Sequence, residues 1–159
     1  MGQADTATDG KRGRRLDRIR PFVNAVVDTN VIAYFVLGTE PFVEETREFM
    51  SLLDEAWAPA LWEAEFANAI WMATRHKILN VDDALNRLTL ASGLGIHVVP
   101  IHTLWQGALV RAHLSKVAVY DTLFVELAAR EHLPLATFDA ALLKAFPEIA
   151  FRPAALLSK

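Results

Sequence analysis

Short apolar segments alternate with longer segments of helical spacing along most of this chain. Apolar side chains at consecutive positions predict strands, whereas apolar side chains three or four residues apart predict helices. The predicted strands are Val23–Val27, Ala56–Ala58, Ile96–Ile101, Leu133–Thr137 and Ile149–Phe151. The predicted helices are Asn30–Leu37, Pro41–Asp54, Leu61–His76, Val81–Leu94, Thr103–Leu114, Tyr120–Glu131 and Asp139–Phe146. This alternation predicts an α/β fold in which helices cover both faces of a parallel sheet.

The 159 residues are expected to form one folded domain behind a polar leader, and they contain no internal repeat. Residues 1–21 hold six basic and three acidic residues, a charge of +3. The remainder holds ten basic and sixteen acidic residues, a charge of −6, which gives the net charge of −3. We predict a flexible basic leader at 1–21 and a globular domain at 22–159. The leader could contact RNA phosphates, or it could be a solvated tail.

Composition narrows the chemistry and the location. The chain has no cysteine, which excludes disulfide bonds, thiolate metal sites and cysteine nucleophiles. No apolar run approaches the ~18 residues that a membrane span needs, and the N-terminus lacks the apolar core of a signal peptide. The five histidines show no spacing that is typical of a zinc site. We therefore expect a soluble cytoplasmic protein that does not associate with membranes.

Four acidic residues stand where the apolar pattern makes a carboxylate costly. Asp28 and Asp139 follow predicted strands, and Glu65 and Asp121 lie on helix faces that are otherwise mostly apolar. A buried carboxylate is unfavourable unless it is paired, hydrogen-bonded or bound to a cation. Because ligand sites of parallel sheets gather at the carboxyl ends of the strands, we expect Asp28 and Asp139 at one edge. Convergence of all four would give an oxygen-ligand site suited to Mg²⁺ or Mn²⁺.

Each of these residues also has a structural explanation when it is taken alone. Asp28 and Asp139 are good helix N-caps, and Asp121 could cap a helix that starts at the next residue. Glu65 could pack its stem at the rim of the core and extend its head into water. Glu63, two residues earlier, competes with Glu65 for the same role. The argument therefore depends on the joint placement of the acidic residues.

Four short motifs, in order and spacing, resemble those of the PIN-domain nuclease family, and within it the VapC-type toxins. The motifs are Val26-Val27-Asp28-Thr29-Asn30-Val31, Glu65-Phe66-Ala67-Asn68-Ala69, Tyr120-Asp121-Thr122-Leu123-Phe124-Val125-Glu126-Leu127-Ala128 and Thr137-Phe138-Asp139-Ala140-Ala141-Leu142. The resemblance covers about residues 23–152 and favours Glu65 over Glu63.

The resemblance implies a three-layer α/β/α sandwich around a parallel sheet and a ribonuclease that depends on Mg²⁺ or Mn²⁺. The residues that it implies as catalytic metal ligands are Asp28, Glu65, Asp121 and Asp139. The residues that it places around them, to orient ligands or water, are Thr29, Asn30 and Thr137. It also implies an RNA substrate, a VapB-like antitoxin as partner and a homodimer. An RNA-processing PIN nuclease without an antitoxin and a catalytically silent binding module are the alternatives.

Two other families fit the same residues less well. A haloacid-dehalogenase-like phosphatase needs a second aspartate at position 30, which is Asn30 here. A receiver domain opens with paired acids that this chain lacks.

The candidate residues for RNA binding are Arg75, Lys77, Arg111 and Lys116. They could equally be solvated cations that suit helix C-termini. An antitoxin groove is hypothesised around Phe35, Phe42, Phe49 and Trp57.

Overall fold

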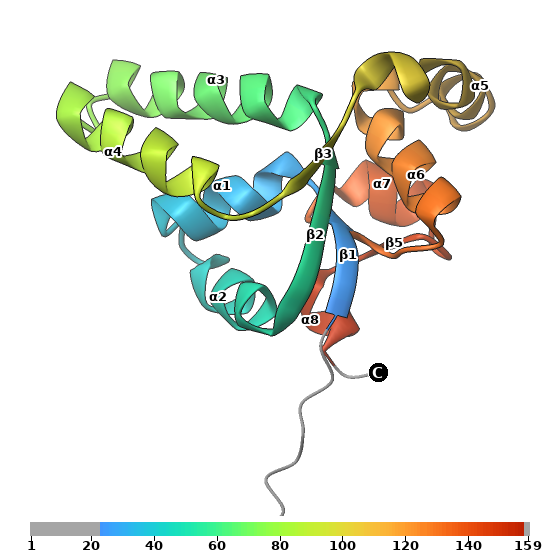
Figure 1. Cartoon of the computed structure of the whole chain (residues 1–159), viewed down its shortest axis with the longest axis horizontal. Coiled ribbons are helices and arrows are strands. Elements are labelled where there is room, and N and C mark those ends of the chain that lie inside the picture. The colour runs from blue at the N-terminus through green and yellow to red at the C-terminus, as the bar shows by residue number, and fades with distance from the viewer. Residues whose placement is uncertain (1–22, 158–159) are drawn as a thin grey trace, which may run out of the picture.

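A computed structural model describes residues 23–157 of the chain, so the predicted leader lies outside the described residues. Its centre is a parallel sheet of five strands in the order β3-β2-β1-β4-β5 (Figure 1). The strands are β1 (Val23–Val27), β2 (Leu53–Pro59), β3 (His97–Val99), β4 (Leu135–Ala136) and β5 (Ala150–Phe151). Every predicted strand is therefore present, and the pairing is parallel throughout, as the alternating pattern predicts.

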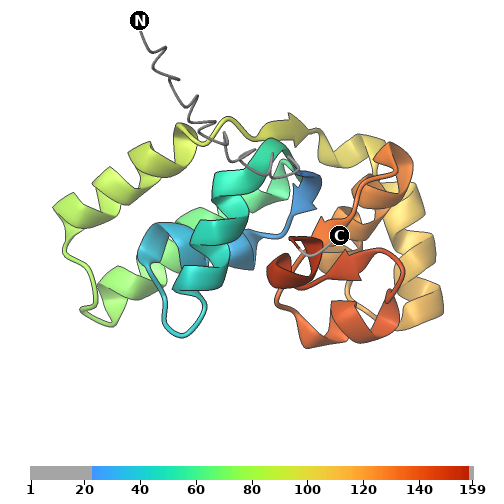
Figure 2. The same cartoon turned by 90° about the horizontal axis from the view of Figure 1, so that it is seen from below.

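Helices cover both faces of this sheet, which gives the predicted three-layer α/β/α arrangement. The helices are α1 (Thr29–Leu37), α2 (Val43–Leu52), α3 (Leu61–Arg75), α4 (Val81–Ser92), α5 (Trp105–Ser115), α6 (Val119–Glu131), α7 (Ala140–Ala145) and α8 (Pro153–Leu156), with a 3₁₀ turn η1 at Ile101–Thr103. Helices α1 to α4 lie on one side of the sheet, and α5 to α7 lie on the other (Figures 1 and 2).

The core follows from the apolar strands. The central strands β1 and β4 are almost entirely apolar, and Val26, Val27 and Leu135 are fully buried between the two helical layers. Strands buried on both faces are expected to be continuously apolar rather than alternating. Phe49 from α2 and Phe124 from α6 are also fully buried and belong to the same core. Among the helices described, none has the length and apolar character that crossing a lipid bilayer demands.

Several predicted boundaries were wrong where long-range pairing overrides local spacing. The helix predicted over Pro41–Asp54 ends at Leu52, because Leu53 adopts extended backbone angles and pairs with Val23 of β1. The strand predicted over Ile96–Ile101 is shortened to β3, and the residues after Pro100 form η1 instead. The four-residue helix α8 was not predicted, since one turn gives too little periodicity to recognise.

Candidate active site

Two neighbouring strands deliver Asp28 and Thr137 side by side. In β1 and β4, Val27 is paired with Ala136, so the residues that follow leave the sheet at the same edge. The backbone N–H of Asp28 donates to the Ala136 carbonyl at 3.0 Å. The Thr137 hydroxyl donates to Oδ2 of Asp28 at 2.6 Å, and both residues are buried. The sheet therefore places a hydrogen-bonded carboxylate at its carboxyl edge.

Asn30 and Thr29 connect this carboxylate to the elements around it. Asn30 Nδ2 donates to Asp28 Oδ2 at 3.0 Å, while its Oδ1 accepts the backbone N–H of Phe138 at 3.2 Å. The Thr29 hydroxyl donates to Oε2 of Glu65 on α3 at 2.5 Å. The first turn of α1 thus holds β1, the loop after β4 and helix α3 in one hydrogen-bonded arrangement.

Burial and the charges of neighbouring acidic side chains raise the pKa values of Asp28, Glu65 and Asp121. Burial raises the pKa of Asp28 to about 7, and the charges of Glu65 and Asp121 add to the rise. The hydrogen bond from Thr137 acts in the opposite direction and lowers this pKa. Burial and the charge of Asp121 raise the pKa of Glu65. Burial and the charge of Asp139 raise the pKa of Asp121. Each of the four residues therefore has an electrostatic effect on at least one of the others or receives one, and their convergence on one metal site stays a prediction.

The local geometry separates the structural explanations that the sequence left open. Asp121 lies in the first turn of α6, which begins at Val119, so it is not the N-cap of a helix starting after it. Asp28 occupies the N-cap position of α1, but its side chain makes no capping hydrogen bond. Asp139 does cap α7, since its Oδ1 accepts the Leu142 N–H at 2.9 Å. Glu63 is exposed, whereas Glu65 is half-buried and bonded to Thr29.

A family model described as PIN domain matches residues 25–149, which contain all of these acidic residues. The chain belongs to the PIN domain family. The match spans most of the chain, from the middle of β1 to the segment before β5. Members of this family are generally nucleases, so the family supports a hydrolase.

Solved structures show the same fold. The chain is similar to a toxin–antitoxin complex from Klebsiella pneumoniae, with 15% identity over 81% of this chain and 97% of that chain and a TM-score of 0.60. It is similar to PAE2754 from Pyrobaculum aerophilum, with 20% identity over 86% and 93% and a TM-score of 0.63. It is also similar to VapBC2 from Rickettsia felis bound to a promoter DNA fragment, with 10% identity over 82% and 98% and a TM-score of 0.57. Curated protein sequences give no match.

The carboxylates of this PIN domain do not form a closed metal cage as they are arranged here. Among residues 23–157, no three acidic or histidine side chains lie in a geometry that could hold a metal ion. The oxygens of Asp28 and Glu65 are turned toward Thr137, Asn30 and Thr29 instead. Joint coordination by three or more of these side chains therefore requires them to move closer together than they are in this structure.

The basic residues considered for RNA binding lie in different settings. Arg75 is exposed at the end of α3, with its guanidinium 5.5 Å from the centre of the Trp71 ring. Lys77 and Lys116 are exposed and follow α3 and α5 with positive φ values. Arg111 is half-buried, and its Nε donates to Glu126 at 2.7 Å. The RNA-binding roles stay predictions.

Sequence reasoning missed an ion-pair cluster centred on the buried Glu126 of α6. Its carboxylate accepts from Nε of Arg111 on α5 and from Nε of Arg130 one turn along α6, at 2.7 and 2.6 Å. These hydrogen bonds lower the pKa of Glu126 even though burial opposes them. A Cβ at Gly107 would lie 2.2 Å from this carboxylate, so glycine allows α5 to approach α6. The signal was available as a glutamate inside the apolar run 124–128 with an arginine four residues later.

An aromatic cluster beside the acidic site was also missed. Tyr34, Phe42 and Phe138 have ring centres 4.6 to 5.4 Å apart, and the Arg152 guanidinium lies 4.5 Å from the Phe138 ring. Arg152 is ion-paired with Glu45. This packing holds Phe138, the residue between Thr137 and Asp139.

The antitoxin groove hypothesised around Phe35, Phe42, Phe49 and Trp57 was wrong in one respect. Phe49 is fully buried and cannot line it.

Proposed function

We propose that this PIN domain is a Mg²⁺- or Mn²⁺-dependent endoribonuclease that hydrolyses RNA phosphodiester bonds. One arrangement carries the proposal: Glu65 and Asp121 lie close enough to Asp28, at the carboxyl edge of the sheet, for their charges to raise its pKa, and the charge of Asp139 raises the pKa of Asp121. A fold that gathers carboxylates there bears an energetic cost that a divalent cation would remove. The family match supports nuclease chemistry of this kind.

The side chains present fit a hard divalent cation. All four candidate ligands offer carboxylate oxygens, the donors that Mg²⁺ and Mn²⁺ prefer, and the described residues offer no competing thiolate. The charges that help to raise the pKa values of Asp28, Glu65 and Asp121 come from other carboxylates, and no basic side chain of residues 23–157 is among the contributors. When bound, such a cation lowers the pKa of a water and stabilises the charge of the phosphoryl transition state.

The surrounding hydroxyls and amide position the proposed ligands. Thr137 and Asn30 both donate to Oδ2 of Asp28, which fixes that carboxylate in orientation. Thr29 does the same for Glu65. Such supporting hydrogen bonds typically contribute 10- to 100-fold to metal affinity or activity. We therefore assign Thr29, Asn30 and Thr137 to positioning and the four acids to metal binding and catalysis.

We further propose that the chain acts in the cytoplasm as the toxin of a VapBC-type pair. Two similar structures support this assignment, a toxin–antitoxin complex and VapBC2 bound to DNA. An RNA-processing PIN nuclease without an antitoxin is the second candidate, because it would use the same acidic site. A catalytically silent binding module accounts poorly for the site, since four uncompensated carboxylates would then cost stability without a function.

A homodimer is part of the proposal. Helix α5 and the start of α6 expose several large apolar side chains, which are Trp105, Leu109, Val110, Leu114, Val119 and Tyr120. Exposed apolar surface of this extent on a small domain is typical of a protein interface. Sedimentation velocity should detect a dimer that Leu109→Glu converts to a monomer, and a wild-type monomer at micromolar concentration would contradict this part.

The nuclease proposal is tested by RNA cleavage with purified full-length protein. We expect cleavage in Mg²⁺ or Mn²⁺ that stops in EDTA and in the Asp121→Asn and Glu65→Gln variants, because each removes a proposed ligand charge. Glu63→Gln is the matched control, since Glu63 is exposed on the same helix turn, and it should keep wild-type activity. Full activity of Glu65→Gln with loss in Glu63→Gln would reverse the assignment.

A further inference from the structure

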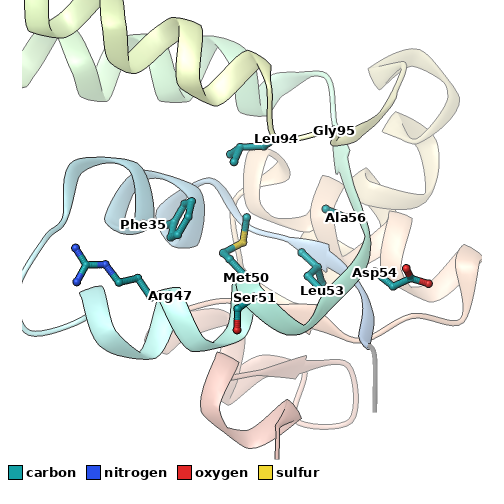
Figure 3. A pocket seen from close by; sticks show the side chains of 9 residues that line it. All are labelled: Phe35, Arg47, Met50, Ser51, Leu53, Asp54, Ala56, Leu94 and Gly95. Atoms are coloured by element: carbon teal, nitrogen blue, oxygen red, sulfur yellow. The ribbon is translucent and has the colours of Figure 1, made fainter. Parts of the chain in front are cut away.

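A cavity lies at the opposite end of the sheet from the acidic site. It measures about 310 Å³ and lies where α2, the start of β2 and the segment after α4 meet (Figure 3). Its apolar lining is formed by Phe35, Met50, Leu53, Ala56 and Leu94. Arg47, Ser51 and Asp54 supply polar groups to the same cavity. The cavity therefore combines an apolar interior with charged groups, which suits a short amphipathic peptide segment.

We propose that the cavity binds the chain's own N-terminal segment, with residues 19–22 placing the apolar side chains of Ile19 and Phe22 over Met50 and Leu94. This inference goes beyond the nuclease proposal and does not depend on it. It gives residues 1–22, whose sequence precedes the first strand, an intramolecular docking site.

The point where this segment joins the domain supports the proposal. Val23, the first described residue, is paired with Leu53, and Leu53 lines the cavity. The N-terminal segment therefore joins the domain at Val23, whose strand partner Leu53 lines the cavity. An extended chain advances about 3.5 Å per residue, so Ile19 can reach about 14 Å from Val23. Because the tether is this short, the local concentration of the segment at the cavity is in the millimolar range or above.

Charge complementarity supports the same occupant. The elements that contribute to the cavity wall expose acidic residues: Glu44 and Glu48 on α2, and Glu55 and the lining residue Asp54 on β2. Arg47 is the basic residue among the cavity's lining groups, and Glu44 pairs with it. The leader carries +3, with Arg18 and Arg20 on either side of Ile19. Opposite charges on the two sides favour docking in this register and make it sensitive to salt.

Methionine methyl groups and an engineered cysteine allow a direct test in the full chain. The sequence has three methionines and no cysteine, so Ile19→Cys introduces a single site for a nitroxide spin label. Met50 lines the cavity, whereas Met72 lies on α3 and serves as an internal control. We expect the label to broaden the ¹³C-methyl signal of Met50 strongly and to leave that of Met72 nearly unchanged. Equal broadening of both signals, or none at Met50, would overturn the proposal.

Two further measurements separate the alternative occupants. In a mixture, one protein carries the spin label without ¹³C enrichment and the other carries ¹³C-methyl groups without a spin label. The Met50 signal should then stay sharp, and its broadening would show that a second copy supplies the segment. The Arg18→Glu, Arg20→Glu double variant should lose most of the Met50 broadening, whereas Arg12→Glu, Arg14→Glu, with the same change in charge, should keep it. Identical behaviour of the two double variants would contradict a specific site and leave the cavity to another partner.

Discussion

Replacing Asp28 with asparagine should stabilise the metal-free protein in a manner that depends on pH. Asp28 is 9% exposed as a residue, and burial raises the pKa of its carboxyl group from 3.8 to about 7 on folding. The asparagine amide keeps an oxygen that can accept the Thr137 and Asn30 hydrogen bonds while it removes the charge. Asp28→Asn therefore isolates the cost of placing a negative charge at this position.

The sign follows from proton linkage. Between pH 3.8 and about 7 the folded state binds more protons at Asp28 than the unfolded state, so the free energy of unfolding falls as pH rises. The difference between those two pKa values corresponds to about 4 kcal/mol in the free energy of unfolding. Wild type has lost this full amount of stability above pH 7. Relative to wild type, Asp28→Asn should be near neutral at pH 4 and more stable by about 4 kcal/mol at pH 8.

Urea unfolding in EDTA at pH 4, 6 and 8 measures this difference, with Glu63→Gln as the control for loss of an exposed charge on a neighbouring helix. We expect the midpoint of Asp28→Asn to separate from wild type progressively as pH rises. Saturating Mn²⁺ at pH 8 should reduce the separation, because a cation stabilises the carboxylate form. A variant that is less stable than wild type at pH 8 in EDTA would refute the reasoning, since it would show that the Asp28 charge stabilises the fold.

The remaining predictions concern the supports of the site. Gly107→Ala should lower stability by about 1–3 kcal/mol, measured by thermal unfolding, because its Cβ would displace the Glu126 carboxylate from its arginine partners. Gly93→Ala, where the nearest atom is 3.4 Å away and φ is negative, should change stability by less than about 0.5 kcal/mol, and equal losses would contradict the account. Thr137→Val should reduce RNA cleavage by about 10- to 100-fold with the fold retained, whereas Thr137→Ser should recover most of it by restoring the hydroxyl that orients Asp28.

The strand-end acids show how much of the site could be predicted from sequence. Asp28 and Asp139 follow apolar strands, and parallel topology alone brings such positions to one edge. The placement of Asp121 needed the structure, since only the start of α6 at Val119 distinguishes a first-turn residue from an N-cap. The distance between carboxylates could not be predicted either, because it depends on side-chain orientations that Thr29, Asn30 and Thr137 set.

Long-range contacts account for what the sequence did not predict. Leu53 continues the helical spacing of α2, and its pairing with Val23 across the sheet is what makes it extended. The partner of Glu126 on the neighbouring helix is Arg111, fifteen residues away, and no local periodicity relates the two. Gly107 looks like an unfavourable residue within a helix until the Glu126 carboxylate is seen to fill the space of its missing side chain.

Calorimetric titration of Mn²⁺ into the metal-free full-length protein tests the central claim most directly. If the four acids form a divalent-metal site, wild type should bind Mn²⁺ saturably, Glu63→Gln should bind it equally well, and Asp28→Asn and Asp121→Asn should each lose most of the affinity. Binding that is absent in wild type, or unchanged in both aspartate variants, would contradict the assignment of this sheet edge as the catalytic metal site.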